Sequence, residues 1–388
     1  MTDTTRDMTS VQLLEKLISF DSTSRNSNLP LIDFIQEYLE RYGVKSQRVD
    51  YEEDNKTNLY ATIGPDIEGG IVLSGHTDVV PVDGQDWTSD PFAMVERDGR
   101  LFGRGTCDMK GFIAVALAAV PKFVEAGLKT PVHFAFSCDE EVGCTGVRPL
   151  IDHIVSELTK PSAVIVGEPT SMQVVNGHKN ACRFKTTIRG HEAHSSCTHL
   201  GVSAILNAGE MLNEVGRIAE DYRLRGDPSG RFDPPYTTVQ VGMIEGGTAN
   251  NIIPGHCSFD WEARMLPEHT VEELTDRIDA FAKTLEPAMK AVSPDAGIKT
   301  TVENSIPGLA PQEGSPVEVL ALNLAKANST SAVSYGTEAG LFQRAGIPAI
   351  VCGPGSIEQA HKPDEYVDIS QLKQCEGFIE RLVGHCAS

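Results

Sequence analysis

Short apolar runs that end in polar turns recur along the first half of this chain. The clearest examples cover residues 71–81, 132–143 and 163–170, and each run has the length of a buried β-strand. Segments with helix-forming composition, such as 112–124, lie between them. Strands that alternate with helices predict an α/β domain with a mostly parallel sheet and helices on both faces. Because ligands collect at the carboxyl ends of strands in such sheets, we expect the polar turns to share one crevice.

A different order of elements interrupts this alternation. The pattern predicts strands at 183–189, 237–244, 257–264 and 298–302, with helices at 201–219 and 271–289. This is the β-α-β-β-α-β order of a ferredoxin-like unit, and the charged, Gly- and Pro-rich segment 221–235 is expected to be a surface loop. We therefore predict a discontinuous catalytic domain formed by residues 1–180 and 305–388, and an inserted domain formed by residues 181–304.

Residues that can bind metal ions lie in turns punctuated by glycine or proline, three of them directly after an apolar run. They are His76, Asp108, Glu141, Glu168 and His361. If Asp108 bridges two zinc ions, His76 and Glu168 complete one site, whereas Glu141 and His361 complete the other. Each ion then has three protein ligands and an open position for a shared water, as catalytic zinc requires. Ions in such pairs lie about 3.5–4 Å apart and can polarise a carbonyl group.

Two acidic residues beside these ligands have expected roles in the chemistry. Adjacent side chains in a turn diverge, so Glu140 can face the water and act as the general base while Glu141 faces the metal. Asp78 is expected to accept the imidazole N–H of His76, which fixes the tautomer of the ring. Taken singly, such residues are more often solvated, structural or helix-capping. Their occurrence together favours the metal centre.

The stretches around these residues resemble the co-catalytic zinc aminoacylase and carboxypeptidase family. The matching stretches are Ser-Gly-His-Thr-Asp-Val-Val-Pro (74–81), Gly-Arg-Gly-Thr-Cys-Asp-Met-Lys-Gly (103–111), Asp-Glu-Glu-Val-Gly (139–143), Gly-Glu-Pro-Thr (167–170) and Ala-His-Lys-Pro-Asp-Glu-Tyr (360–366). The resemblance covers nearly the whole chain and implies the roles given above for the five ligands and Glu140. One departure is Asn180, which stands where relatives often have glycine and leaves the geometry of a hinge there open.

The resemblance also implies residues that bind substrate. Asn251 and Arg264 match positions that hold the substrate carboxylate, a task that suits the planar fork of arginine. Gly336 and Thr337 match positions that line the pocket. We expect Glu338, which follows them, to contact the ammonium group of an ornithine-type substrate.

A homodimer is the expected assembly, because in the family the inserted domain joins two subunits. His194 lies in this domain and is implied to reach the active site of the partner subunit, where it would stabilise the developing oxyanion. A four-stranded sheet of this kind has edges that must be covered or paired. The alternative interpretation of His194 is a surface-loop histidine.

The resulting functional hypothesis is hydrolysis of an N-acyl amino acid amide. The looser stretches 86–92, 246–254, 337–340 and 353–361 most resemble the acetylornithine deacetylase branch, which implies conversion of N2-acetyl-L-ornithine to L-ornithine and acetate in arginine biosynthesis. Succinyl-diaminopimelate desuccinylases, other N-acyl-amino-acid deacylases and dinuclear-zinc dipeptidases of the family are alternatives. A non-catalytic relative is a further alternative, which the complete ligand set disfavours. We expect two zinc ions per subunit, with Co²⁺ or Mn²⁺ as substitutes.

Composition adds constraints on partners and location. The 54 acidic and 33 basic residues give a net charge of −21, which disfavours nucleic acid and anionic membranes as partners. Residues 1–20 lack the apolar core of a signal peptide, and no apolar run is long enough to span a bilayer. The nine cysteines form no Cys-x-x-Cys pair, which fits a reducing cytosol, so a cytoplasmic location is expected.

Overall fold

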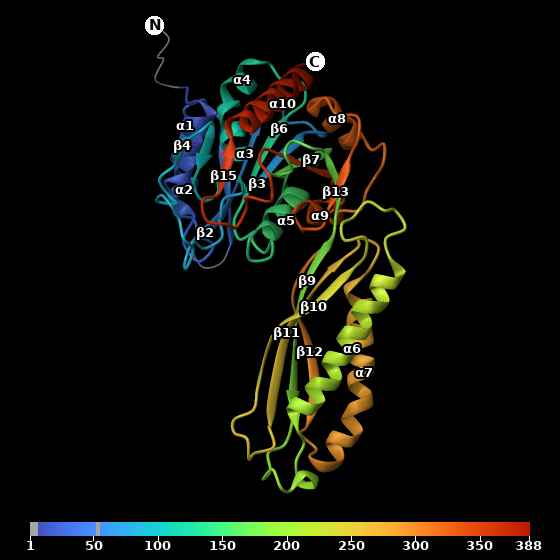
Figure 1. Ribbon diagram of the computed structural model, residues 1–388. Helices are drawn as coiled ribbons and strands as arrows, with labels where there is room; N and C mark the ends of the chain where they lie inside the picture. The colour runs from blue at the N-terminus through green and yellow to red at the C-terminus, as the bar shows by residue number, and fades with distance from the viewer. Residues whose placement is uncertain (1–6, 52–54) are drawn as a thin grey trace. The chain divides into compact units, whose positions relative to one another are not determined.

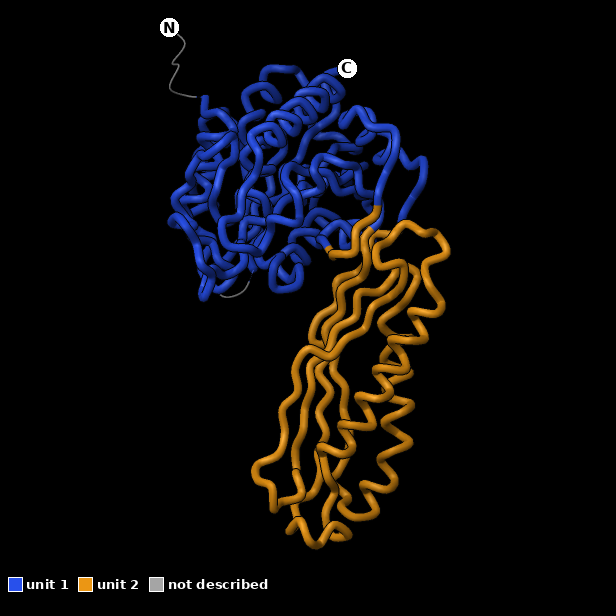
Figure 2. Tube along the Cα trace, viewed as in Figure 1, with its two compact units in different colours: residues 1–177, 311–331, 337–388 blue, residues 178–310, 332–336 orange. Residues whose placement is uncertain are grey.

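The computed structural model describes residues 7–51 and 55–388. The chain divides into two compact units, which Figure 2 distinguishes by colour. Unit 1 comprises Met1–Gly177, Pro311–Ser331 and Thr337–Ser388, and unit 2 comprises His178–Ala310 and Ala332–Gly336. Unit 1 is therefore discontinuous in sequence, and nearly all of unit 2 is inserted between its first two segments.

An eight-stranded mixed sheet forms the centre of unit 1 (Figure 1). Its order is β1 (Ser46–Tyr51), β2 (Lys56–Ile63), β6 (Val132–Ser137), β3 (Ile71–His76), β7 (Ala163–Pro169), β14 (Ala349–Gly353), β8 (Val175–His178) and β13 (Ser331–Val333). The central strands β6, β3, β7 and β14 are parallel, and all four are buried along their whole length, as their nearly continuous apolar sequences require. The prediction of a parallel sheet is confirmed for this centre.

Antiparallel strands at the sides of the sheet correct the expected topology in part. β1 pairs antiparallel with β2, β2 with β6, and β8 with β14. β1 and β2 are consecutive strands that pair antiparallel, and such a pair needs no crossover connection. A small second sheet, which the sequence did not predict, joins β15 (Tyr366–Asp368), β5 (Arg100–Phe102) and β4 (Val95–Arg97).

Helices cover both faces of the large sheet, as predicted. One face contributes Leu73, Phe134 and Ile165 to an extensive apolar core. The helices that share this core are α1 (Ser10–Ile18), α2 (Leu29–Glu40), α3 (Lys110–Ala118), α4 (Val120–Glu125), α8 (Pro316–Ala325) and α10 (Ile369–Ala387). The alternate strand residues, such as Val164, face the other way. There α5 (Val147–Glu157) contacts β6, and α9 (Ala339–Arg344) contacts β7 and β14.

Unit 2 has the ferredoxin-like order that the sequence predicts. Its elements are β9 (Asn180–Arg189), a short 3-10 turn at Thr198–Leu200, α6 (Ala204–Arg225), β10 (Thr238–Gly246), β11 (His256–Met265), α7 (Val271–Val292) and β12 (Gly297–Ile306). The four strands pair antiparallel in the order β10-β11-β9-β12, and α6 and α7 pack against them (Figure 1). In the core of this unit Phe184 stacks on Trp261, with 4.1 Å between ring centroids.

Both ends of helix α6 differ from the sequence prediction. The helix begins at Ala204, not residue 201, because the Ser203 side chain caps it by accepting the N–H of Leu206. It continues to Arg225, so the prediction of a loop from residue 221 is wrong for its first five residues. Asp221 accepts hydrogen bonds from Arg225 and from Arg277 of α7, and these contacts hold the last turn. No helix among residues 7–51 and 55–388 is long and apolar enough to cross a membrane.

Candidate metal centre

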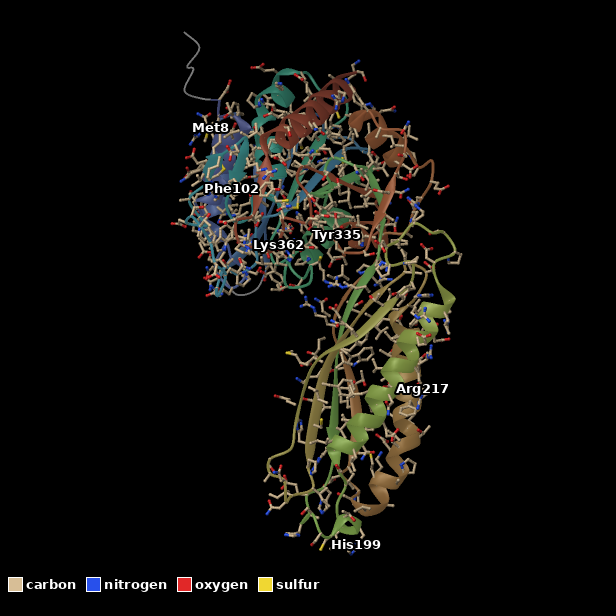
Figure 3. All side chains as sticks on the ribbon, viewed as in Figure 1. Met8, Phe102, His199, Arg217, Tyr335 and Lys362 are labelled. Carbon is tan, nitrogen blue, oxygen red and sulfur yellow. The ribbon has the colours of Figure 1, made fainter. Side chains whose placement is uncertain are left out.

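The five predicted ligands lie in unit 1, at the carboxyl ends of parallel strands or in loops. His76 is the last residue of β3, Glu168 lies near the end of β7, and Glu141 lies in the turn that follows β6. These side chains are neighbours because β3 runs parallel to β6 on one side and to β7 on the other. Asp108 precedes α3, and His361 lies in the loop between β14 and β15, next to Lys362 (Figure 3).

The ligand atoms form two clusters that share Asp108. In the first, Nε2 of His76 lies 3.0 Å from Oδ1 of Asp108 and 3.6 Å from Oε1 of Glu168. In the second, Nε2 of His361 lies 3.3 Å from Oδ2 of Asp108 and 3.0 Å from Oε2 of Glu141. The atoms within each cluster lie within 4.8 Å of one another. Each carboxylate oxygen of Asp108 therefore faces a different cluster, which is the geometry that a bridging ligand needs.

The electrostatics of the clusters fit a pair of divalent cations. Burial raises the pKa of Glu141 to about 7 and the pKa of Glu168 well above its usual value, and the negative charge of Asp108 adds to both shifts. Hydrogen bonds to Asp108 and Glu141 raise the pKa of His361 to about 10, so the carboxylates around this ring favour a positive charge beside them. Oε1 of Glu141 is buried and has no hydrogen-bond partner among the described residues. Imidazole nitrogens with carboxylate oxygens are typical zinc ligands.

His76 is oriented by the backbone of Asp78, which corrects the expected role of the Asp78 side chain. Nδ1 of His76 lies 2.9 Å from the carbonyl oxygen of Asp78 but 3.7 Å from Oδ1 of its carboxylate. A carbonyl can only accept, so Nδ1 carries a hydrogen, and Nε2 is the ring nitrogen that faces the cluster and would bind the metal ion. The backbone carbonyl of Asp78, and not its side chain, therefore orients the His76 ring.

The Asp78 carboxylate instead holds the turn that carries the candidate base. Its oxygens accept the N–H groups of Glu140 and Glu141 at 3.1 and 3.3 Å, and the hydroxyl of Ser24 at 2.7 Å. Oε1 of Glu140 accepts the Cys144 thiol at 3.1 Å. Burial is the largest influence on Glu140 and raises its pKa to about 8, with Glu141 adding to the shift. A carboxyl group with a pKa in this range suits proton transfer near neutral pH.

Lys56 anchors the same turn from its other side, a role that the sequence analysis missed. Its ammonium group lies 2.6 and 2.7 Å from the two carboxylate oxygens of Asp139, and both side chains are largely buried. Asp139 itself has a positive φ of 52°, so the backbone turns at this residue, directly before Glu140 and Glu141. No sequence pattern connects Lys56 with Asp139, because the two residues are far apart along the chain.

Replacing Lys56 by methionine should destabilise the fold by about 3 kcal/mol, because the buried Asp139 carboxylate would lose the ammonium group that lies against both of its oxygens. Urea unfolding of the metal-free protein measures this change. Lys122→Met is the matched control, since Lys122 pairs with Glu380 at 2.9 Å but both side chains are more than half exposed. That variant should unfold like the wild type. Equal losses in the two variants would contradict the role assigned to Lys56.

A buried ion pair supports the loop that carries Asp108. Nη1 of Arg104 lies 2.6 Å from Oε2 of Glu365, and each side chain is only 1% exposed. Glu365 also accepts three backbone N–H groups, from Gly105, Cys107 and Asp108. Both charged residues lie in stretches that carry the family resemblance, yet no pattern in the sequence pairs them.

Glu338 is not placed to contact a substrate, which corrects that expectation. It is fully buried, and its two carboxylate oxygens accept the hydroxyls of Ser74 and Ser137. Thr337 is also fully buried, and its hydroxyl oxygen accepts the N–H of Ala339 at the start of α9. Both side chains therefore support the interior of unit 1. Gly336, which precedes them, is partly exposed.

Glu338→Gln should leave the preference between basic and neutral acyl amino acids unchanged. The amide keeps the shape of the carboxylate and loses about 1 kcal/mol of stability through a weaker hydrogen bond to one serine. Relative kcat/KM on matched substrates and a melting curve test this expectation. A selective loss of activity on basic substrates would restore Glu338 as a substrate contact.

The remaining predicted residues lie in unit 2. His194 is exposed, its Nδ1 lies 2.8 Å from Oγ of Ser196, and the N–H of Ser195 donates to the carbonyl of Asn251, so His194 and Asn251 lie in adjoining loops. His199, labelled in Figure 3, belongs to the same end of this unit. Arg264 lies at the other end of β11, where it pairs in register with Ala181. Its guanidinium lies 3.5 Å from Glu262 and is partly exposed.

Comparison with known proteins gives consistent matches over almost the entire chain. The model of peptidase family M20/M25/M40 matches residues 72–385. An acetylornithine deacetylase of Myxococcus xanthus is 38% identical over 384 residues, which is 96% of each chain. Acetylornithine deacetylases of Photorhabdus laumondii and Proteus mirabilis are 34% and 35% identical, over 97% of this chain and 96% of each relative.

Solved structures share the fold at lower identity. A tripeptidase of Staphylococcus aureus has a TM-score of 0.75 at 21% identity, over 97% of this chain and 98% of the relative. A metallo-carboxypeptidase of Sulfolobus solfataricus, itself of family M20, has a TM-score of 0.76 at 17% identity, over 97% and 99%. These structures support the arrangement of a mixed α/β sheet and a separate four-stranded antiparallel sheet.

Proposed function

Because this chain belongs to peptidase family M20/M25/M40, and is therefore a metal-dependent hydrolase, we propose that it cleaves N2-acetyl-L-ornithine to L-ornithine and acetate. The observation that carries the proposal is the pair of clusters that share Asp108, since a dinuclear site suits amide hydrolysis. The identity of 34–38% to three acetylornithine deacetylases over nearly their whole length supports the substrate. The reaction supplies ornithine, which fits a role in arginine biosynthesis.

The residues of unit 1 would divide the work of the reaction. Two zinc ions, bound by His76 with Glu168 and by Glu141 with His361, and bridged by Asp108, would polarise the amide carbonyl and lower the pKa of water. Glu140 would take the proton from the attacking water and deliver it to the leaving amine. We thus propose that unit 1, close to the predicted segments 1–180 and 305–388, is the catalytic domain.

The residues of unit 2 would bind substrate and stabilise the transition state. Arg264 offers a donor suited to the substrate carboxylate, and Gly336 would line the pocket. Because Asn251 lies beside His194 at the opposite end of β11 from Arg264, it would reach the same carboxylate from the partner subunit. We propose that His194 acts in the active site of the partner subunit, where its N–H would donate to the carbonyl oxygen as negative charge develops. Such a role requires a dimer.

Homodimerisation through unit 2 is supported by an apolar edge. β10 is an edge strand, and its residues Met243 and Ile244 are 65% and 55% exposed. On α6, which packs against β10, Ile205 and Leu206 are 42% and 74% exposed. An edge strand with exposed apolar residues is prone to pair with another chain.

Ile244→Lys should make the protein monomeric in analytical ultracentrifugation, because it places a charge on the exposed apolar edge. Val302→Lys, on the opposite edge strand β12, is the control and should leave the dimer intact. If the Ile244→Lys variant is also a dimer, β10 does not form the interface.

Acetate release from N2-acetyl-L-ornithine by the metal-stripped protein, before and after zinc is added, tests the proposed reaction. We expect metal-dependent turnover with kcat/KM at least about tenfold above that for neutral N-acetyl amino acids, the difference that one specific contact can supply. Faster cleavage of N-succinyl-diaminopimelate would indicate a desuccinylase, and faster cleavage of unblocked dipeptides would indicate a dipeptidase. Either result would overturn the substrate and keep the metal centre.

A further inference from the structure

We propose that Gln85 is a positioning residue for the metal ligand His361. Together with Arg104 and Glu365 it forms a hydrogen-bonded brace between the loops that carry His361 and Asp108. The brace would set the affinity of the cluster formed by Asp108, Glu141 and His361 for its metal ion. The inference rests on the proposed function, in which this cluster binds one of two ions.

The side chain of His361 is not held in place by burial. Its side chain is 53% exposed, and its backbone has a positive φ of 63°, which residues other than glycine seldom adopt. By contrast, His76 is 1% exposed and ends a central strand. The ring of His361 is therefore placed mainly by the position of its own backbone. The carbonyl oxygen of that backbone accepts a hydrogen bond of 3.0 Å from Nε2 of Gln85.

The orientation of the Gln85 amide is fixed by its other partners. Its Oε1 accepts Nη2 of Arg104 at 2.6 Å and the indole N–H of Trp87 at 3.0 Å. Guanidinium and indole groups can only donate, so the amide oxygen must face them. The amide nitrogen is then left to face the carbonyl of His361, which can only accept. No other orientation of this side chain satisfies all three partners.

The brace continues from Gln85 to the backbone of Asp108. Nη1 of Arg104 binds Oε2 of Glu365, and Oε1 of Glu365 accepts the N–H of Asp108 at 3.0 Å. Hydrogen bonds thus lead without a break from the carbonyl of one ligand to the amide of the other. This fixes the separation of two ligands that approach the same ion from different loops. The cluster of His76, Asp108 and Glu168 does not use His361, so the Gln85 end of the brace is specific to one metal site.

The variant Gln85→Glu isolates the proposed contact. Glutamate has the same shape and keeps an acceptor for Arg104 and Trp87, but it replaces the donor to His361 with a second oxygen. Zinc binding to the full-length protein, measured by competition with a chromophoric chelator, should show two ions in the wild type. In the variant, one dissociation constant should rise by about 10- to 100-fold, the range seen when outer partners of metal ligands are lost, while the other stays within about twofold.

Two further variants make the test decisive. Gln85→Leu, which also lacks the donor, should weaken the same ion. Thr88→Val removes the hydroxyl hydrogen bond to Asp364 in the His361 loop, keeps the backbone N–H bond to the same carboxylate and does not touch Gln85, so it should bind zinc like the wild type. The proposal is overturned if Gln85→Glu binds both ions with wild-type affinity. It is also overturned if Thr88→Val loses as much zinc affinity as Gln85→Glu does. A wild type that binds fewer than two ions would overturn the dinuclear centre itself, and this inference with it.

Discussion

Replacing Glu140 by glutamine is expected to lower kcat by about 10³-fold while both metal ions remain bound. Glutamine keeps the size of the side chain but cannot accept a proton from water. Glu140 belongs to neither cluster of ligand atoms, and its backbone stays anchored through Asp78. Steady-state kinetics on N2-acetyl-L-ornithine, with metal content measured on the same samples, test both parts of this expectation.

Glu338→Gln is the matched control for this change. Both residues are glutamates of unit 1 whose pKa is raised by burial, and both accept side-chain hydrogen bonds. If the loss at Glu140 reflected only disturbed packing or electrostatics, the control would lose a similar amount. A near-normal rate for Glu140→Gln would remove Glu140 from the mechanism. Loss of a metal ion from that variant would instead assign Glu140 to the metal site.

The metal-ligand candidates could be predicted from sequence because local order determines where they lie. His76 and Glu168 lie at the carboxyl ends of buried apolar strands and Glu141 follows another, and parallel strands bring such positions to one edge of a sheet. The ferredoxin-like order of unit 2 could be predicted for a similar reason, since hydrophobic periodicity within each segment specifies its type. The structure brings the five candidates together; their roles as ligands stay a prediction that metal binding must test.

The supporting residues could not be predicted, because their partners are remote in the sequence. Lys56 meets Asp139, and Gln85 meets His361, through side-chain contacts that leave no periodic signal. Asp78 shows a second limit, since the right residue orients His76 through its carbonyl and not its carboxylate. Glu338 shows a third limit. Its place next to the expected pocket residues in the sequence did not indicate that its carboxylate accepts hydrogen bonds from Ser74 and Ser137 in the interior.

Removing the shared ligand should damage the centre more than removing either terminal one. Asp108→Ala deletes the oxygen near His76 together with the oxygen near His361, so we expect less than one zinc ion per chain. His361→Ala deletes one nitrogen of a single cluster, so one ion should remain. Both variants should lose about 10³-fold or more in kcat/KM, since each forfeits several kcal/mol of transition-state stabilisation that a second ion supplies.

Thermal melting with added zinc separates these two variants independently of catalysis. An ion that binds only the folded protein raises its stability in proportion to the logarithm of metal concentration over the dissociation constant. The wild type should therefore show the largest zinc-dependent rise in Tm, His361→Ala a smaller one, and Asp108→Ala almost none. Asp108→Ala also loses the contacts with His76 and His361 that hold the Asp108 pKa below its usual value, so each variant is compared with its own zinc-free melting curve and only the zinc-dependent rise is scored. Equal zinc responses in the two variants would show that Asp108 serves one cluster and does not bridge.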